Sequence, residues 1–129
     1  MFGMTWYKTL TQPPLTPPAW IFPPMWSFLY ILIFLALIIY IIRPTFKNKS
    51  WGVTLFFTQL VLNFLWSPIF FHFHNIGMAL AIVIVMDILA AVTILEFFKI
   101  SKTAGLILIP YLIWIIFATY LNAGFFVLN

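Results

Sequence analysis

The sequence has no cysteine and very little charge. Only six Lys or Arg and two Asp or Glu occur among 129 residues, whereas 65% of the residues are hydrophobic. A soluble domain carries roughly 25% charged residues, so the composition excludes a water-soluble fold and predicts a membrane protein. The lack of cysteine excludes disulfides, thiolate nucleophiles and cysteine-ligated metal sites.

Four long hydrophobic stretches occupy most of the chain, at residues 24–42, 50–74, 76–98 and 103–128. Each is about as long as the 20 or so residues that a helix needs to cross a bilayer. We therefore predict an all-α, multi-pass membrane protein with four transmembrane helices in a single domain over residues 1–129. The remaining chain is too short for a soluble catalytic or DNA-binding domain. We expect no nucleic-acid partner and no cofactor.

The basic residues gather in two of the loops. Three of the six follow the first stretch, namely Arg43, Lys47 and Lys49, and two follow the third stretch, namely Lys99 and Lys102. Only Lys8 precedes the first stretch. Loops rich in Lys and Arg stay in the cytoplasm. We therefore expect both termini, and the loop that holds His72 and His74, to lie on the opposite side of the membrane.

Residues 1–23 are rich in proline and aromatic side chains. Six of the nine prolines fall between positions 13 and 24, which favours an extended or polyproline II backbone over a helix. Aromatic residues such as Trp6, Tyr7, Trp20 and Phe22 suit the depth of the lipid headgroups. Two interpretations remain open: an interfacial segment that leads into the first helix, or a lid over a cavity.

A polar stripe runs along the second hydrophobic stretch. Gln59, Asn63 and Ser67 are spaced by four residues, so they lie on one face of a helix and should point toward protein. Pro68 lacks a backbone donor and is expected to kink the helix near residue 64 and to open space there. The stripe predicts either a pocket or polar contacts that join neighbouring helices.

Asp87 lies at the midpoint of the third stretch. A carboxylate at the centre of a bilayer costs ~2.5–3.5 kcal/mol on insertion scales, so Asp87 should face the interior of the bundle. No Lys or Arg lies inside any stretch, which favours a hydrogen-bonded carboxyl group over an ion pair. A structural hydrogen bond and a direct contact with a ligand are both possible roles.

The fourth stretch places Pro110, Trp114 and Ala118 on one helical face, followed by Leu121. A proline and an alanine on either side of an indole leave a notch beside a flat aromatic wall, which suits a planar ligand. The alternative is that Trp114 packs in the core or anchors the helix in lipid.

Other chemistries lack the residues that they need. His72 and His74 are two residues apart, which is not a helical metal-ligand spacing, so we expect no metal site. The sequence has no glycine-rich phosphate loop and no nucleophile elbow. Asp87 and Glu96 are nine residues apart and do not form a catalytic pair.

Three runs of residues together resemble one known family. They are Trp6-Tyr7-x-x-Leu10-x-x-Pro13-x-x-Thr16-Pro17-Pro18-x-Trp20-x-Phe22-x-x-x-Trp26-x-x-Leu29-Tyr30, then Gln59-x-x-x-Asn63-x-x-Trp66-x-x-x-Phe70-Phe71, and finally Pro110-Tyr111-x-x-Trp114-x-x-Phe117-Ala118-x-Tyr120-Leu121-Asn122. They resemble the first loop with the second helix, the third helix and the fifth helix of the translocator protein family, also called tryptophan-rich sensory proteins or TspO/MBR. The order matches over nearly the whole chain.

The resemblance implies a membrane receptor that binds tetrapyrroles such as protoporphyrin IX, and benzodiazepine-type ligands, in one cavity. It assigns Trp6, Tyr7 and Pro18 to a lid, Trp26, Tyr30, Trp114, Ala118 and Leu121 to the walls, and Asn63 and Ser67 to polar contacts. Some bacterial members are reported to degrade protoporphyrin in light, so a light-dependent enzyme is the alternative, although no catalytic residue is identified. A small-solute transporter that uses Asp87 is a weaker alternative, because it lacks a second membrane-embedded charge.

The chain departs from the family pattern at two places. Family members have five spanning helices, and the four stretches here correspond to helices 2–5, so we expect the chain either to gain stability from a ligand or to pair with a second copy. In addition, no Lys or Arg follows Tyr120, so the sterol motif of the animal proteins is incomplete and cholesterol binding is not predicted. The implied location is a membrane, the cell membrane if the source is bacterial.

Overall fold

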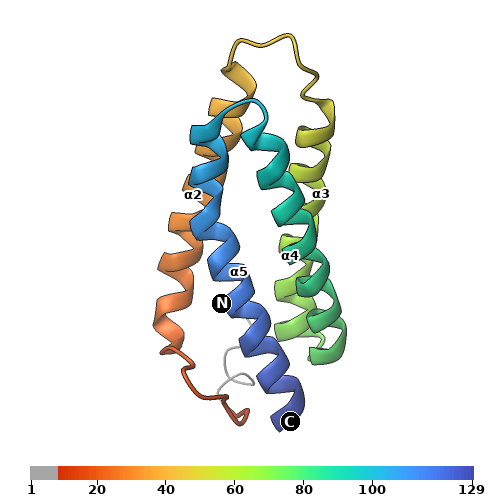
Figure 1. Cartoon of the computed structure of the whole chain (residues 1–129). Coiled ribbons are helices and arrows are strands. Elements are labelled where there is room, and N and C mark those ends of the chain that lie inside the picture. The colour runs from red at the N-terminus through yellow and green to blue at the C-terminus, as the bar shows by residue number, and fades with distance from the viewer. Residues whose placement is uncertain (1–8) are drawn as a thin grey trace.

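The computed structural model describes residues 9–129, apart from the side chains of Ala19 and His72, as a bundle of four long helices (Figure 1). The elements are η1 (Ala19–Ile21), α2 (Phe22–Ile42), α3 (Ser50–Ser67), the π-helical turn η2 (Pro68–His72), α4 (Ile76–Phe98) and α5 (Lys102–Leu128). Four helices, with η2 extending α3, are long and apolar enough to cross a membrane. The predicted all-α membrane fold is therefore confirmed.

Prolines set two of the helix boundaries. The helix α2 begins at Phe22, two residues before the predicted start, because Pro23 and Pro24 fit the first turn, where backbone N–H groups have no partner within the helix. At Pro68 the expected irregularity takes the form of η2, in which the Phe73 N–H donates to the Pro68 carbonyl at 3.0 Å. The helical segment therefore ends at His72 and not at His74 as predicted.

The next two helices begin with side-chain caps. The Asn75 side chain accepts from the Met78 N–H at 3.0 Å at the start of α4, and Ser101 accepts from the Ala104 N–H at 3.3 Å at the start of α5. Each cap pairs a backbone donor that the helix itself cannot satisfy. Both helices therefore start at defined positions directly after short loops.

The four helices are not arranged in chain order. The helix α5 packs against both α2 and α4, and α4 packs against α3. The side chains of α2 and α3 meet at aromatic contacts, where the ring centroids of Phe34 and Phe56 lie 6.0 Å apart. The helix α5 is therefore the main neighbour of α2, and α3 contacts α2 through side chains.

A stack of aromatic rings fills the core at the end of the bundle near residues 43–49. The rings of Tyr40 and Phe97 are parallel to within 8°, with centroids 4.0 Å apart, and Phe56 stacks on the other side of Phe97. Gly52 lies directly against the Tyr40 ring, where a side chain would collide with it. The absence of a side chain at position 52 therefore lets α3 approach the Tyr40 side of α2.

The proline-rich segment lies along the C-terminal end of α5 (Figure 1). The Asn129 side chain accepts from the Thr11 N–H at 3.0 Å and donates to the Thr11 carbonyl at 3.0 Å. Two residues further on, buried Pro13 packs on Gly124 of α5. The Tyr120 hydroxyl of α5 also donates to the Pro14 carbonyl. The segment is therefore attached to α5 by hydrogen bonds at Thr11 and Pro14 and by the close contact of Pro13.

Candidate functional site

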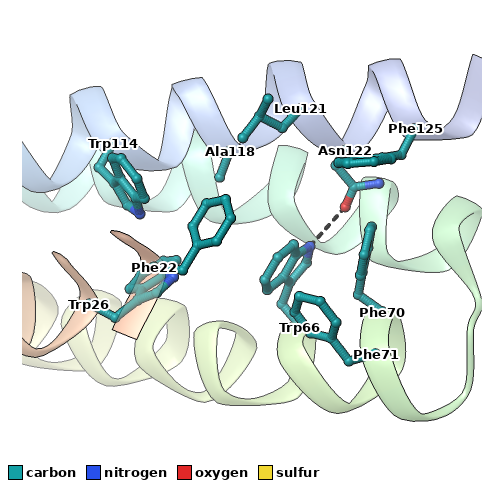
Figure 2. Close-up of a pocket in the computed structure, with 10 residues that line it drawn as sticks. All are labelled: Phe22, Trp26, Trp66, Phe70, Phe71, Trp114, Ala118, Leu121, Asn122 and Phe125. Carbon is teal, nitrogen blue, oxygen red and sulfur yellow. Dashed lines mark hydrogen bonds between the residues drawn. The ribbon is translucent and has the colours of Figure 1, made fainter. Parts of the chain in front are cut away.

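A narrow cavity lies between α2, α5 and the junction of α3 with η2 (Figure 2). Its free volume is only about 30 Å³, and it is partly open. Its lining residues are Phe22, Trp26, Trp66, Phe70, Phe71, Trp114, Ala118, Leu121, Asn122 and Phe125. Aromatic rings dominate the walls, and none of these described residues is charged, which is the composition of a site for an apolar molecule.

Two indoles form one end of this cavity. The rings of Trp26 and Trp114 are almost perpendicular, at 85°, with centroids 6.2 Å apart. Phe22 meets Trp114 at 6.0 Å and 61°. One turn along α5, Ala118 presents only a methyl group, so the wall recedes beside the Trp114 ring. The arrangement offers a flat ligand both ring faces and ring edges.

A hydrogen-bonded pair forms the other end. The Trp66 indole N–H donates to Asn122 Oδ1 at 2.8 Å, as Figure 2 shows, and Asn122 Nδ2 donates to the Ile76 carbonyl at 3.0 Å. The pair joins α3 to α5 and to the start of α4. Because both ends of the Asn122 amide are used, this side chain fixes the wall in place.

A buried chain of hydrogen bonds lies behind the cavity. The Tyr30 hydroxyl donates to Asn63 Oδ1, and Asn63 Nδ2 donates to the Tyr111 hydroxyl at 2.9 Å. The Tyr111 hydroxyl donates to Gln59 Oε1 at 2.6 Å, and Gln59 Nε2 donates to the Phe56 carbonyl at 3.0 Å. For Gln59 and Asn63 the structure therefore favours the interpretation that the polar stripe joins helices, here α2, α3 and α5.

The structure brings together some of the predicted site residues but not all of them. Those that line the cavity are Trp26, Trp114, Ala118 and Leu121. Tyr30 and Asn63 lie in the hydrogen-bond chain behind it, whereas Ser67 and the exposed Pro18 are not among its lining residues. Trp6 and Tyr7 lie outside the described residues. The wall carried by α5 is therefore the part of the predicted site that the structure places most completely.

Sequence reasoning missed six lining residues: Phe22, Trp66, Phe70, Phe71, Asn122 and Phe125. Asn122 and Phe125 could have been found by extending the helical spacing of Trp114, Ala118 and Leu121 by one more turn. Phe70 and Phe71 could not, because neighbouring residues on a regular helix point about 100° apart and η2 alters that spacing.

Asp87 lies between α4 and α5 and is not among the cavity residues. The Thr119 hydroxyl lies 2.5 Å from Asp87 Oδ2 and 2.8 Å from the Ile115 carbonyl, and its single proton is shared between these two acceptors. The side chain is half-buried. The structural hydrogen bond is thus the role that the geometry favours over contact with a ligand in this cavity.

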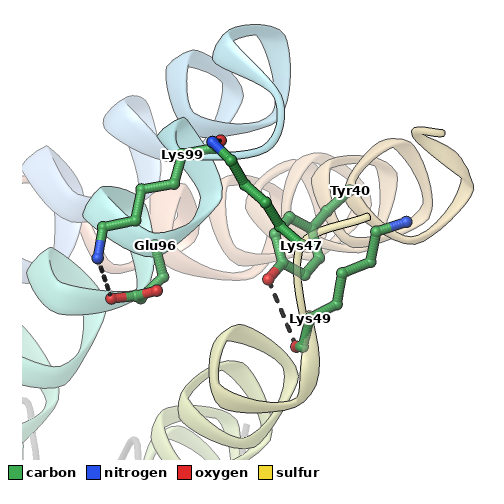
Figure 3. Close-up of polar contacts among 5 residues, drawn as sticks. All are labelled: Tyr40, Lys47, Lys49, Glu96 and Lys99. Atoms are coloured by element: carbon green, nitrogen blue, oxygen red, sulfur yellow. Dashed lines mark hydrogen bonds and ion pairs between the residues drawn. The ribbon is translucent and has the colours of Figure 1, made fainter. Parts of the chain in front are cut away.

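The two basic loops meet at one end of the bundle (Figure 3). Lys47 Nζ donates to the Lys99 carbonyl at 2.8 Å, which joins the loop after α2 to the end of α4. Lys99 in turn pairs with Glu96 at 2.9 Å, and Lys49 Nζ donates to the Arg43 carbonyl at 2.7 Å. These lysines therefore bind the C-terminal carbonyls of helices, where positive charge is favourable.

Together, the apolar bundle and the aromatic cavity define a small multi-pass membrane protein of the sensor or small-molecule-binding class. The model of the TspO/MBR family matches residues 2–128, and the chain belongs to this family. It is 44% identical over 126 residues to the tryptophan-rich protein TspO of Archaeoglobus fulgidus, covering 97% of this chain and 80% of the relative.

Bacterial and animal proteins are similar as well. The tryptophan-rich sensory protein of Cereibacter sphaeroides is 37% identical over 91% of this chain and 72% of its own length. The translocator protein of Homo sapiens is 34% identical over 93% of this chain and 72% of its own length. The family resemblance predicted from the three runs of residues is therefore confirmed.

Proposed function

We propose that this protein is a membrane receptor that binds a tetrapyrrole such as protoporphyrin IX, or a benzodiazepine-type ligand, in the cavity of Figure 2. The observation that carries the proposal is the Trp26–Trp114 pair, which presents a ring face and a ring edge beside the bare wall at Ala118. A flat ring system gains dispersion and apolar burial from such walls.

The narrowness of the cavity bears on how a large ring would bind. A tetrapyrrole needs the side chains around the slot to move apart, because the walls already contact one another at Phe22 and Trp114. None of the described residues that line the cavity is a cation, so the carboxylates of protoporphyrin should remain at its opening. Binding should therefore be accompanied by a rearrangement of α2 against α5.

The proline-rich segment is proposed as the lid of this site. Its residue Leu10 packs against the cluster of Phe70, Phe71, Ala79, Leu121 and Phe125, four of which also line the cavity. This contact supports the lid interpretation over a simple interfacial lead-in. The predicted lid residues Trp6 and Tyr7 precede the described part of the segment.

Titration with protoporphyrin IX tests the proposal, with absorbance and tryptophan quenching as readouts. Trp114→Ala removes one wall and should weaken binding by about 1–3 kcal/mol. Trp51→Ala is the matched control, because Trp51 is an exposed tryptophan of α3 outside the cavity. His72→Ala and His74→Ala should leave binding unchanged.

The opposite pattern would contradict the proposal. If the histidine variants abolish binding while Trp26→Ala and Trp114→Ala bind normally, the ligand occupies a haem-like site near the loop before α4. Asn63→Leu provides a further readout. Asn63 is hydrogen-bonded through both its oxygen and its nitrogen. We therefore expect Asn63→Leu to lower the unfolding temperature and to have little effect on ligand selectivity.

Light-dependent degradation of the porphyrin is the second candidate function. It is favoured by the position of the Trp26 and Trp114 rings, which would lie beside a bound photosensitiser. Illumination of the complex in air should then bleach the porphyrin absorbance faster than in Trp114→Phe. Equal bleaching by the variant, by the protein and by detergent alone would leave only the receptor function.

A further inference from the structure

The amide groups near the cavity are each held by two hydrogen bonds. Asn122 uses its oxygen for the Trp66 indole and one N–H for the Ile76 carbonyl. Asn63 uses its oxygen for Tyr30 and one N–H for Tyr111. Each amide keeps a second N–H, but the two bonds fix the plane of the amide. Neither asparagine can therefore turn toward a ligand without breaking a bond that joins two helices.

The Trp114 indole is in a different state. Its Nε1 is buried and has no hydrogen-bond partner within residues 9–129, and Figure 2 shows the nitrogen end of the ring turned toward the space between α5 and α2. The nearly perpendicular Trp26 ring stands 6.2 Å away, centroid to centroid. Contact of an N–H with a ring face is a weak interaction, and a buried donor left without an acceptor is unfavourable.

Building on the proposed function, we propose that Trp114 selects the ligand by donating its indole N–H. The slot should prefer a flat, uncharged aromatic ring system with a hydrogen-bond acceptor on its edge over the same ring system without one. A ligand acceptor that receives a hydrogen bond from this N–H gives the buried donor a partner. A hydrocarbon of equal shape leaves the donor buried and unpaired. Because the described residues that line the slot carry no charge, a charged edge gains no counter-ion from them.

Acridine and anthracene form the matched pair of probes for this test. Both are flat three-ring molecules of the same shape, and acridine has one ring nitrogen that is an acceptor and is uncharged at pH 8. Each is titrated into the full chain in detergent, with quenching of tryptophan fluorescence as the readout. Partition of the probes into micelles is the same for every variant. The ratio of the two Kd values, anthracene to acridine, therefore isolates the protein's preference.

In Trp114→Phe the ring remains and the donor is lost, so the ratio should fall by about 2- to 12-fold, the value of one net hydrogen bond. Trp26→Phe and Trp66→Phe can weaken the binding of both probes but should leave the ratio of the two Kd values unchanged. For Trp66 the reason is that its N–H already donates to Asn122. Trp51→Phe, outside the cavity, should change neither affinity nor ratio. An unchanged ratio in Trp114→Phe, or an equal fall in Trp26→Phe, overturns the proposal.

A measurement on the unmodified protein guards against misfolding of the variant. With indole nitrogens labelled by 15N, the Trp114 N–H resonance should move downfield with acridine and not with anthracene. If protoporphyrin binds but neither the ratio nor this resonance depends on the acceptor, the receptor function stands and the role of Trp114 as a donor is wrong. If the probes behave as expected and protoporphyrin does not bind, the donor role of Trp114 stands and the proposal of a tetrapyrrole ligand is wrong. If none of the three molecules binds, both the receptor proposal and the donor role are wrong.

Discussion

Pro13 packs directly on the Cα of Gly124, so that a methyl group at position 124 would lie 2.5 Å from the proline Cβ. Both partners are rigid backbone-bound groups, so neither can move away by rotating a side chain. Glycine at position 124 is therefore a requirement of the way the segment is attached.

Gly124→Val should detach the segment from α5. We expect a loss of about 1–3 kcal/mol of stability from overpacking, seen as a lower unfolding temperature in detergent. Because the chain has no cysteine, a Leu10→Cys background reports the release directly through faster maleimide labelling. Gly77→Ala is the control, since its methyl group would meet only the edge of the exposed Phe126 ring at 3.2 Å. Equal labelling with glycine or valine at position 124 would contradict this role.

Tyr111→Phe should destabilise the bundle without changing its shape. The hydroxyl accepts from Asn63 and donates to Gln59, so its removal takes away the partner of one buried donor, Asn63 Nδ2, and of one buried acceptor, Gln59 Oε1, at a cost of about 1–3 kcal/mol. The control Tyr120→Phe removes an exposed hydroxyl that donates to the Pro14 carbonyl and should cost less. Thermal unfolding of both variants checks the difference, and equal losses would refute it.

Asp87→Asn should be at least as stable as the native chain. The amide oxygen can still accept from Thr119, and the variant avoids the cost of a charge within the bilayer. Glu96→Gln removes the exposed ion pair with Lys99 and should change stability by less than about 1 kcal/mol. Unfolding curves and the amount of protein in membranes give the comparison. A clear loss in Asp87→Asn alone would show that the charge itself is needed.

The membrane orientation can be tested with single cysteines. The lysines that join the ends of α2 and α4 place both basic loops at one end of the bundle, which should be cytoplasmic. An impermeant maleimide added to intact cells should label Asn75→Cys and not Thr45→Cys. Labelling only of position 45 would reverse the topology.

Ligand binding should stabilise the protein by an amount set by its affinity. At a free protoporphyrin concentration of 100 times Kd, the free energy of unfolding should rise by about 2.7 kcal/mol. If a second copy completes the cavity instead, stability should depend on protein concentration and chemical cross-linking should give a dimer. A monomer whose melting does not respond to saturating protoporphyrin contradicts both expectations.

The sequence predicted the bundle well because transmembrane helices can be recognised from length and hydropathy alone. The bilayer core has no water to pair with backbone N–H and C=O groups, so each long apolar stretch has to be a helix. The details at Pro68 were not predictable in the same way. A proline indicates an irregular turn, but the choice of a π-helical turn over a simple kink depends on the packing of Phe70 and Phe71 against Phe125.

The site was predicted where one helix carries it and missed where several helices build it. The spacing of Trp114, Ala118 and Leu121 on α5 is readable from sequence, and all three line the cavity. The engagement of Asn122 by Trp66 joins residues 56 positions apart, and no local pattern contains that information. For the same reason, Asn63 reads as a candidate ligand contact, although its partners lie on α2 and α5.

The packing of α2 against α5 also dictates the order in which the site can form during synthesis. When α2 enters the membrane, its main neighbour α5 has yet to be translated, so the surface of α2 that packs against α5 has no helix partner until α5 arrives. Trp26 and Trp114 come from these two helices, and the cavity therefore exists only after α5 has been inserted. A ligand cannot serve as a template for the earlier insertion steps; it can only act on the completed bundle.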